Sequence, residues 1–157
     1  DWDLLEAKRY VKENSFDFVV ETIGQMSNMV IVSKAADVML EKLRTFLEVI
    51  QTQENIIMPT NTTIPHSYNI LLEGEDYTLG KVIEYVLYIK HYNNNPGSSN
   101  LLTYCGFRKP HPHIDKSYIR LGFTSPTTPT DIIGLLVNSL SDIRNIFQKI
   151  SLEFKNE

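Results

Sequence analysis

Side chains that could bind a metal ion gather around one short, proline-containing segment of the sequence. The candidate zinc ligands are His66, Cys105, His111, His113 and Asp115. A zinc site requires three or four converging ligands, and apart from His111-x-His113 these residues show no recognisable ligand spacing. Pro110 and Pro112 restrict the backbone on either side of His111. We therefore expect a rigid loop in which His111 makes hydrogen bonds, and keep a small metal-binding protein that uses His111 and His113 as an alternative.

Acidic side chains form a second group that could do chemistry. Glu73, Glu75 and Asp76 could imitate a catalytic carboxylate pair, but they directly precede a predicted helix. Carboxylates at that position more often cap the helix and interact with its dipole. The sequence also has no glycine-rich phosphate loop and no Gly-x-Ser-x-Gly motif. We predict that the chain has no catalytic residues, no cofactor and no metal site.

The charge distribution limits the possible partners. The formal net charge is −4, although one local basic cluster contains Arg108, Lys109, Lys116 and Arg120. Such a cluster in an acidic chain favours a solvated face or a protein contact, with little or no direct nucleic-acid binding. A single cysteine fits a reducing compartment, and no apolar run reaches the length of a membrane span.

Residues 68–80 must form the element that positions the acidic group. Tyr68, Ile70 and Leu72 alternate with their neighbours, which predicts a strand. The following apolar residues recur at helical spacing and are Leu79, Val82, Ile83, Val86 and Ile89. This stretch is therefore a strand-to-helix elbow, where Asp76 or Thr78 caps the helix and Gly80 allows another backbone to approach.

Two long helices with apolar seams flank this element. The first is predicted over about residues 28–51, with the seam Val32, Ala36, Met39, Leu43, Phe46 and Ile50. The last is predicted over about residues 129–154, with the seam Ile133, Leu136, Leu140, Ile143, Phe147, Ile150 and Phe154. Alternating steps of three and four residues require a facing helix.

The remaining elements are shorter. Phe16, Phe18 and Val20 alternate with Asp17, Val19 and Glu21 and predict a strand ending at Gly24. Residues 52–66 contain Pro59 and no sustained period, which predicts a linker. Residues 101–108 and 118–123 predict an antiparallel strand pair. At the start of the last helix, Thr128, Pro129 and Asp131 are expected to form an N-terminal cap.

Two motifs resemble a known family. The elbow contains Glu75, Asp76, Thr78, Leu79 and Gly80, and the second segment contains Gly106, Pro110, His111 and Pro112. Together they resemble the signature of the eleventh subunit of eukaryotic RNA polymerase II and its archaeal L counterpart. The resemblance covers residues 67–157. Tyr77 and Lys81 depart from the His and Asn that cellular relatives commonly carry.

A second resemblance lies near the start of the chain. The sequence Phe18-Val19-Val20-Glu21-Thr22-Ile23-Gly24, followed by a long helix, is similar to the end of the polymerase's third subunit, archaeal D. The domain organisation implied is a third-subunit-like strand and helix over residues 1–51, a linker over 52–66, and an eleventh-subunit-like domain over 67–157. Third- and eleventh-like parts in one chain resemble the fused subunit of large cytoplasmic DNA viruses.

These resemblances imply a fold and a role. The expected fold is α+β, of the RNA polymerase alpha/D/L dimerisation type shared with the bacterial alpha N-terminal domain, with a small antiparallel sheet and long helices in a bundle. The expected role is a non-catalytic scaffold of a DNA-directed RNA polymerase. Its partners would be the largest and second-largest subunits, small polymerase subunits and an upstream part of its own chain supplying a missing helix. A viral subunit would lie in the host cytoplasm, a viral factory or the virion.

The helix-bundle interface implied is formed by Val32, Met39, Leu43, Phe46, Ile50, Val82, Val86, Ile133, Leu136, Leu140, Ile143, Phe147 and Ile150. If one helix of the bundle is missing, these seams are partly exposed, and we expect the isolated chain to self-associate. A free-standing dimeric adaptor that shares the fold without the transcriptional role is the other alternative.

Overall fold

The computed structural model describes residues 1–12, 15–53, 55–92 and 96–155. The long helices and the strands are α1 Asn28–Thr52, β1 Ile57–Pro59, β2 Ser67–Glu73, α2 Tyr77–His91, β3 Leu102–Arg108, β4 Lys116–Phe123 and α3 Pro129–Lys155. Short helical turns, η1 Trp2–Glu6 and η2 Ala7–Arg9, precede them. Within these residues, no helix combines the length and the apolar character that a membrane crossing demands.

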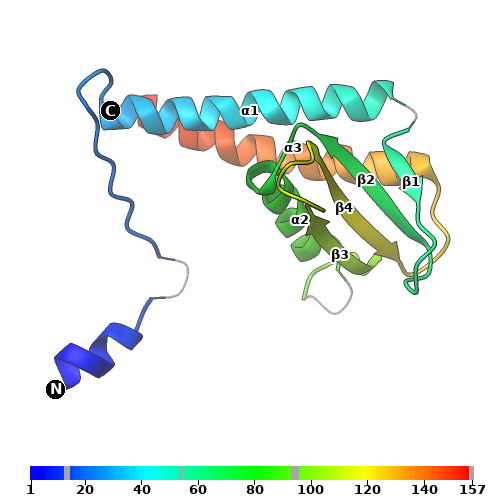
Figure 1. Cartoon of the computed structure of the whole chain (residues 1–157), viewed down its shortest axis with the longest axis horizontal. Helices are drawn as coiled ribbons and strands as arrows, with labels where there is room; N and C mark the ends of the chain where they lie inside the picture. The colour runs from blue at the N-terminus through cyan, green and yellow to red at the C-terminus, as the bar shows by residue number, and fades with distance from the viewer. Residues whose placement is uncertain (13–14, 54, 93–95, 156–157) are drawn as a thin grey trace.

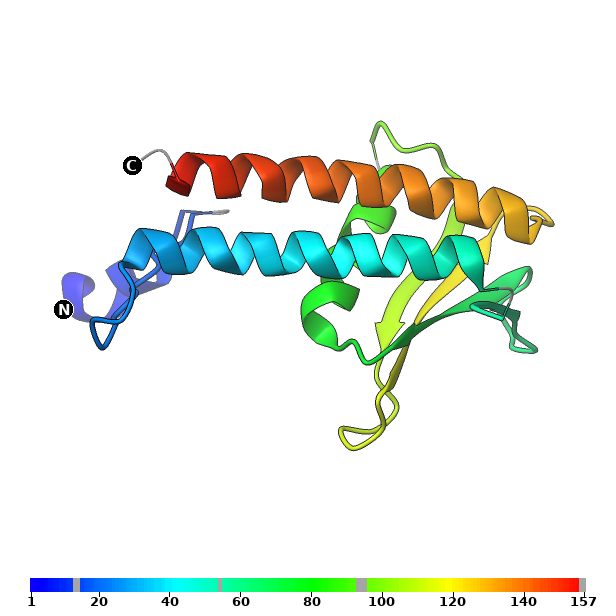
Figure 2. The ribbon, with the colours of Figure 1, turned by 90° about the horizontal axis from the view of Figure 1, so that it is seen from above.

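The described strands form one antiparallel sheet in the order β1-β2-β4-β3, and the long helices gather on one side of it (Figure 1). Alternation along the strands directs one set of side chains toward the helices, where Ile70, Leu72, Ile119 and Leu121 are fully buried. The opposite set includes Asn69, which lies beside Arg120 in the β2–β4 register. No described element covers that second face (Figure 2).

Helices α1 and α3 form an antiparallel pair that continues past the edge of the sheet (Figure 2). Over the sheet, Leu43 and Phe46 of α1 join Leu136 and Ile143 of α3 in the main core. Beyond the sheet the pair is joined by polar contacts, in which Ser151 Oγ donates to Asp37 Oδ1 at 2.6 Å. The predicted heptad seams therefore do face a partner helix: the seam of α1 packs against α3, and the seam of α3 packs against α1.

The helix starts are fixed by side-chain caps. Ser27 Oγ accepts from the Val30 N–H, and Asp76 Oδ1 accepts from the Thr78 N–H at 3.0 Å. At α3 the Thr128 hydroxyl accepts from the Asp131 N–H, while the Asp131 carboxylate accepts from the Thr128 N–H. This reciprocal arrangement is a capping box, as the sequence predicts.

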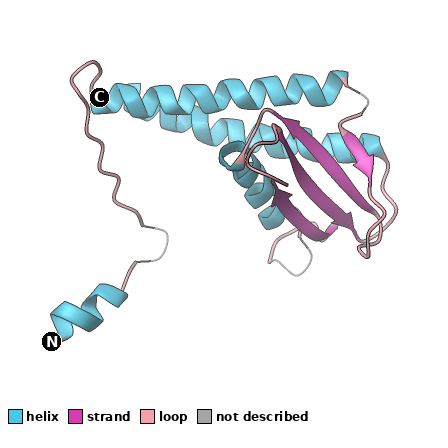
Figure 3. Ribbon diagram, in the orientation of Figure 1, coloured by secondary structure: helices cyan, strands magenta, loops and turns pink. Residues whose placement is uncertain are grey.

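The strand predicted at residues 16–23 is wrong. This segment forms no strand, and Phe18 and Ile23 are 88% and 91% exposed. It leads away from the body as a loop (Figure 3). A strand needs a partner for its backbone groups, and none of the described strands lies beside this segment.

Two smaller differences concern the linker and α2. The predicted linker contains β1, whose Ile57 pairs with Ile70 of β2. On α2, Leu87 is fully buried and Ile89 is 45% exposed, so the apolar stripe follows Leu87 rather than Ile89. The other predicted elements form within a few residues of the expected bounds.

Candidate functional site

The two family-like motifs meet where α2 begins beside β3. Gly80 is buried in the first turns of α2, and the Phe107 ring of β3 lies directly on it. A Cβ at Gly80 would stand 2.0 Å from Phe107 Cε2, closer than any real contact. Tyr77 packs edge-on against the same ring, with centroids 5.1 Å apart. The glycine therefore admits an aromatic side chain, not the backbone that the sequence analysis expects.

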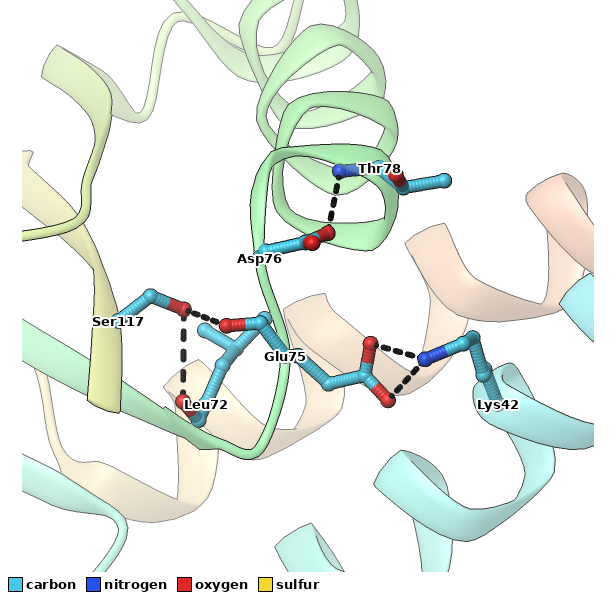
Figure 4. A network of polar contacts seen from close by, with 6 residues as sticks. All are labelled: Lys42, Leu72, Glu75, Asp76, Thr78 and Ser117. Carbon is cyan, nitrogen blue, oxygen red and sulfur yellow. Dashed lines mark hydrogen bonds and ion pairs between the residues drawn. The ribbon is translucent and has the colours of Figure 1, made fainter. Parts of the chain in front are cut away.

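A polar network holds the elbow between β2 and α2 (Figure 4). The buried Ser117 hydroxyl of β4 donates to the Glu75 carbonyl at 2.9 Å and lies 3.4 Å from the Leu72 carbonyl. The Glu75 carboxylate accepts two hydrogen bonds from Lys42 of α1, at 2.8 and 2.7 Å. Glu75 thus joins the family-like elbow to the helix from the other half of the chain.

Asp76 caps the start of α2. Its hydrogen bond from the Thr78 backbone N–H stabilises the carboxylate and lowers the Asp76 pKa. The Asp76 carbonyl also accepts from the Gly80 N–H at 3.0 Å. Leu79, between these groups, is fully buried in the core. The motif residues therefore stabilise the start of α2.

The histidine segment forms an exposed turn between β3 and β4. The His113 N–H donates to His111 Nδ1 at 3.2 Å, which explains why the two rings lie close together. The Asp115 carbonyl accepts from the Gly74 N–H at 2.8 Å. Across the described residues, no three His, Cys, Asp or Glu side chains converge as a metal site would require.

Cys105 and His66 do not join this turn. Cys105 is half-buried on β3, and burial raises the pKa of its thiol to about 12. The thiol donates to the Glu84 carbonyl at 3.6 Å, so it is a weak nucleophile at neutral pH. His66 is exposed, and its carbonyl accepts from the Phe123 N–H.

Most of the predicted helix interface is used within the chain itself. The members that are buried are Met39, Leu43, Phe46, Ile50, Leu136, Leu140 and Ile143. The members that are half-buried are Val32, Val82, Val86, Ile133, Phe147 and Ile150. Val82 and Val86 pack beside the core from α2, while Val32 and Ile150 lie toward the end of the helix pair beyond the sheet.

A groove of about 470 Å³ runs along α1 and α3. Its apolar lining is formed by Leu40, Leu43, Leu47, Val137 and Leu140. Its polar lining is formed by Asp37, Glu41, Arg44, Ser141, Arg144 and Gln148. The sequence analysis missed Leu40 and Leu47 because they fall one residue after the seam positions Met39 and Phe46.

The polar border of this groove is already paired on the α1 side. Arg44 contacts Glu41 and also Glu48, the latter at 2.6 Å. Hydrogen bonds from Ser151 and then from Lys155 lower the pKa of Asp37, which keeps this carboxylate charged. The groove therefore combines an apolar floor with fixed charges, the composition of a helix-packing surface.

Comparison with known proteins gives one informative similarity. No protein-family model matches the sequence. The chain is 28% identical over 92 residues to the DNA-directed RNA polymerases I and III subunit RPAC2 of Schizosaccharomyces pombe. The match includes 59% of this chain and spans 66% of the relative, just under two thirds of its length. The α+β architecture, with its small antiparallel sheet and long helices, is consistent with the RNA polymerase alpha/D/L-type fold.

Proposed function

We propose that this chain is a non-catalytic assembly subunit of a DNA-directed RNA polymerase. The observation that carries the proposal is the antiparallel α1–α3 pair, which extends beyond the sheet and presents an apolar groove bordered by charges. The similarity to RPAC2, a subunit of RNA polymerases I and III, supports polymerase assembly as the role of this surface. Such a helix pair can serve as a platform because the apolar floor of its groove can be buried against a further helix.

The arrangement joins two parts of the chain that the sequence analysis assigns to different subunits. Helix α1 belongs to the third-subunit-like part and α3 to the eleventh-subunit-like part, and their seams share one core. The Lys42–Glu75 ion pair adds a second connection. Covalent linkage makes this pairing intramolecular and independent of protein concentration.

The resemblances to the third and eleventh polymerase subunits support a more specific proposal. We infer a fused third- and eleventh-like subunit of a viral polymerase acting in the host cytoplasm, with the two largest subunits docking on the platform. The exposed apolar segment of residues 16–23 supports further burial in the assembly, because large apolar side chains seldom remain uncovered in a working complex. Small polymerase subunits would bind at the platform margin.

The proposal is tested by purifying the tagged protein from cells that express it naturally. We expect two large polypeptides to co-purify and the eluate to synthesise RNA from a DNA template. Recovery of the chain without such polypeptides, under salt that preserves complexes, would contradict an assembly role.

Matched variants link that result to the groove. Leu40→Glu places a charge on the apolar floor and is expected to reduce recovery of the large polypeptides by about tenfold or more. Asn145→Asp adds the same charge on an exposed position of α3 outside the groove lining. Equal recovery with both variants would show that the groove is not the docking surface.

A further inference from the structure

The uncovered face of the sheet carries a small polar recess. Its lining consists of Asn69, Tyr104, Gly106, Arg108, Tyr118 and Arg120, and its volume is about 60 Å³. The register explains this grouping, because Arg120 on the inner strand β4 lies opposite Asn69 on one side and Gly106 on the other. Residues that are far apart in sequence thus meet at one point on the side away from the helices.

Neighbouring side chains fix the shape of the recess. Arg120 Nε donates to Asn69 Oδ1 at 2.8 Å, which orients the guanidinium and leaves its terminal nitrogens available as donors. The Tyr104 ring lies along the strand over Gly106, where a Cβ would stand 2.6 Å from the tyrosine oxygen. Arg108 lies two pairs further along, on the same face, and is paired with Tyr118 in the register.

The charge of the recess is not balanced within the described part of the chain. Neither Arg108 nor Arg120 has a carboxylate partner there, whereas Arg44 on the helix side contacts two. On the same sheet face, Lys116 lies 3.9 Å from Glu73 and is outside the recess lining.

We propose that this recess binds a carboxylate side chain from an acidic segment of a partner protein. Arginine donors in a fixed fork match a carboxylate, and the volume accommodates one acidic side chain but is too small for a nucleobase. The recess lies on the opposite side of the sheet from the helix groove, so its binding is independent of the proposed assembly role.

The test uses the full chain and three probes: a hexaglutamate peptide with blocked ends, a hexathymidylate oligonucleotide and inorganic phosphate. Binding is followed by nuclear magnetic resonance through the arginine Nε–H signals. We expect the hexaglutamate peptide to shift the signals of Arg108 and Arg120 in a saturable way, and to bind more tightly than either phosphate-containing probe. Stronger binding of hexathymidylate or phosphate, or no saturable shift with the peptide, would overturn the proposal.

Three variants distinguish a shaped site from general attraction. Arg120→Gln removes the central donor, and Asn69→Asp places a carboxylate of the chain itself beside Arg120. Each is expected to weaken peptide binding by about tenfold or more, while the backbone amide spectrum reports an intact fold. Lys116→Gln removes the same unit of charge from the same face outside the recess, and a comparable loss from it would overturn the proposal.

Discussion

At the scale of single residues, the family-like glycine is explained by one contact. Gly80 has no side chain because the Phe107 ring occupies that space. Sequence analysis predicts the glycine's importance and the elbow around it, but assigns it to backbone approach. The missing information is how β3 packs against α2: Cys105 and Phe107 both face this helix, and it is Phe107 that lies on Gly80 while Cys105 contacts the Glu84 carbonyl.

The substitution Gly80→Ala tests this contact. Overpacking costs about 1–3 kcal/mol, while alanine returns up to about 1 kcal/mol of helix propensity. We expect a net decrease of about 1–2 kcal/mol in the free energy of unfolding, measured by urea denaturation. In a Phe107→Ala background the same change should be neutral or stabilising, and an equal loss in both backgrounds would contradict the contact.

His91, at the end of α2, makes stability depend on pH. Burial lowers the pKa of His91, and Lys90 lowers it further, while Asp142 acts in the opposite direction. Below about pH 6.5 the unfolded chain takes up a proton that native His91 resists. Stability should therefore fall as the pH decreases from that value toward the lowered native pKa, with no further loss from this group below it.

The measurement compares melting temperatures at about pH 7.5 and about pH 5.5. We expect His91→Gln to show a smaller decrease than the original chain across this interval. His113→Gln, whose residue lies in the exposed turn, provides the control and should keep the original decrease. The same decrease in the His91 variant and the original chain would show that another group is responsible.

At the scale of elements, periodicity predicted the helices well and the strands unevenly. The spacing in α1 and α3 is set by the helix itself, so their seams can be identified from sequence. Strands depend on partners that sequence does not give: residues 16–23 have the right alternation but no partner, and β1 pairs with β2 despite Pro59 at its end. Sequence analysis named Arg108 and Arg120 as part of a basic cluster, but it did not place Asn69 and Tyr104 beside them, because that grouping depends on the strand register.

The two faces of α3 contribute differently to the stability of the fold, and one aspartate substitution on each face measures the difference. Leu140 is 2% exposed and lies in the core, while Ile146 is 52% exposed. Leu140→Asp should lower the free energy of unfolding by at least about 4 kcal/mol, since it buries a charge and removes apolar contacts. Ile146→Asp should change it by less than about 1 kcal/mol. Similar thermal denaturation midpoints for both variants would show that α3 does not bury the Leu140 face.

At the scale of the whole molecule, the N-terminal segment that leads away from the packed body exposes many large apolar side chains. Trp2, Leu5, Phe16 and Val19 are all at least 60% exposed. We expect the isolated chain to associate as its concentration increases, observed by sedimentation velocity. Removing residues 1–23 should reduce this association, and a monomer at every concentration for the complete chain would contradict the prediction.

The helix pair has one further consequence for how the chain is connected. Because α1 begins beside the place where α3 ends, Ser33 Oγ lies 3.5 Å from the Ser151 carbonyl. A short connector between these helix ends would close the body into a ring without displacing either helix. New ends could then open in the exposed turn between β3 and β4. The packed body is thus suited to circular permutation, and the order of its elements along the chain is separable from their arrangement in space.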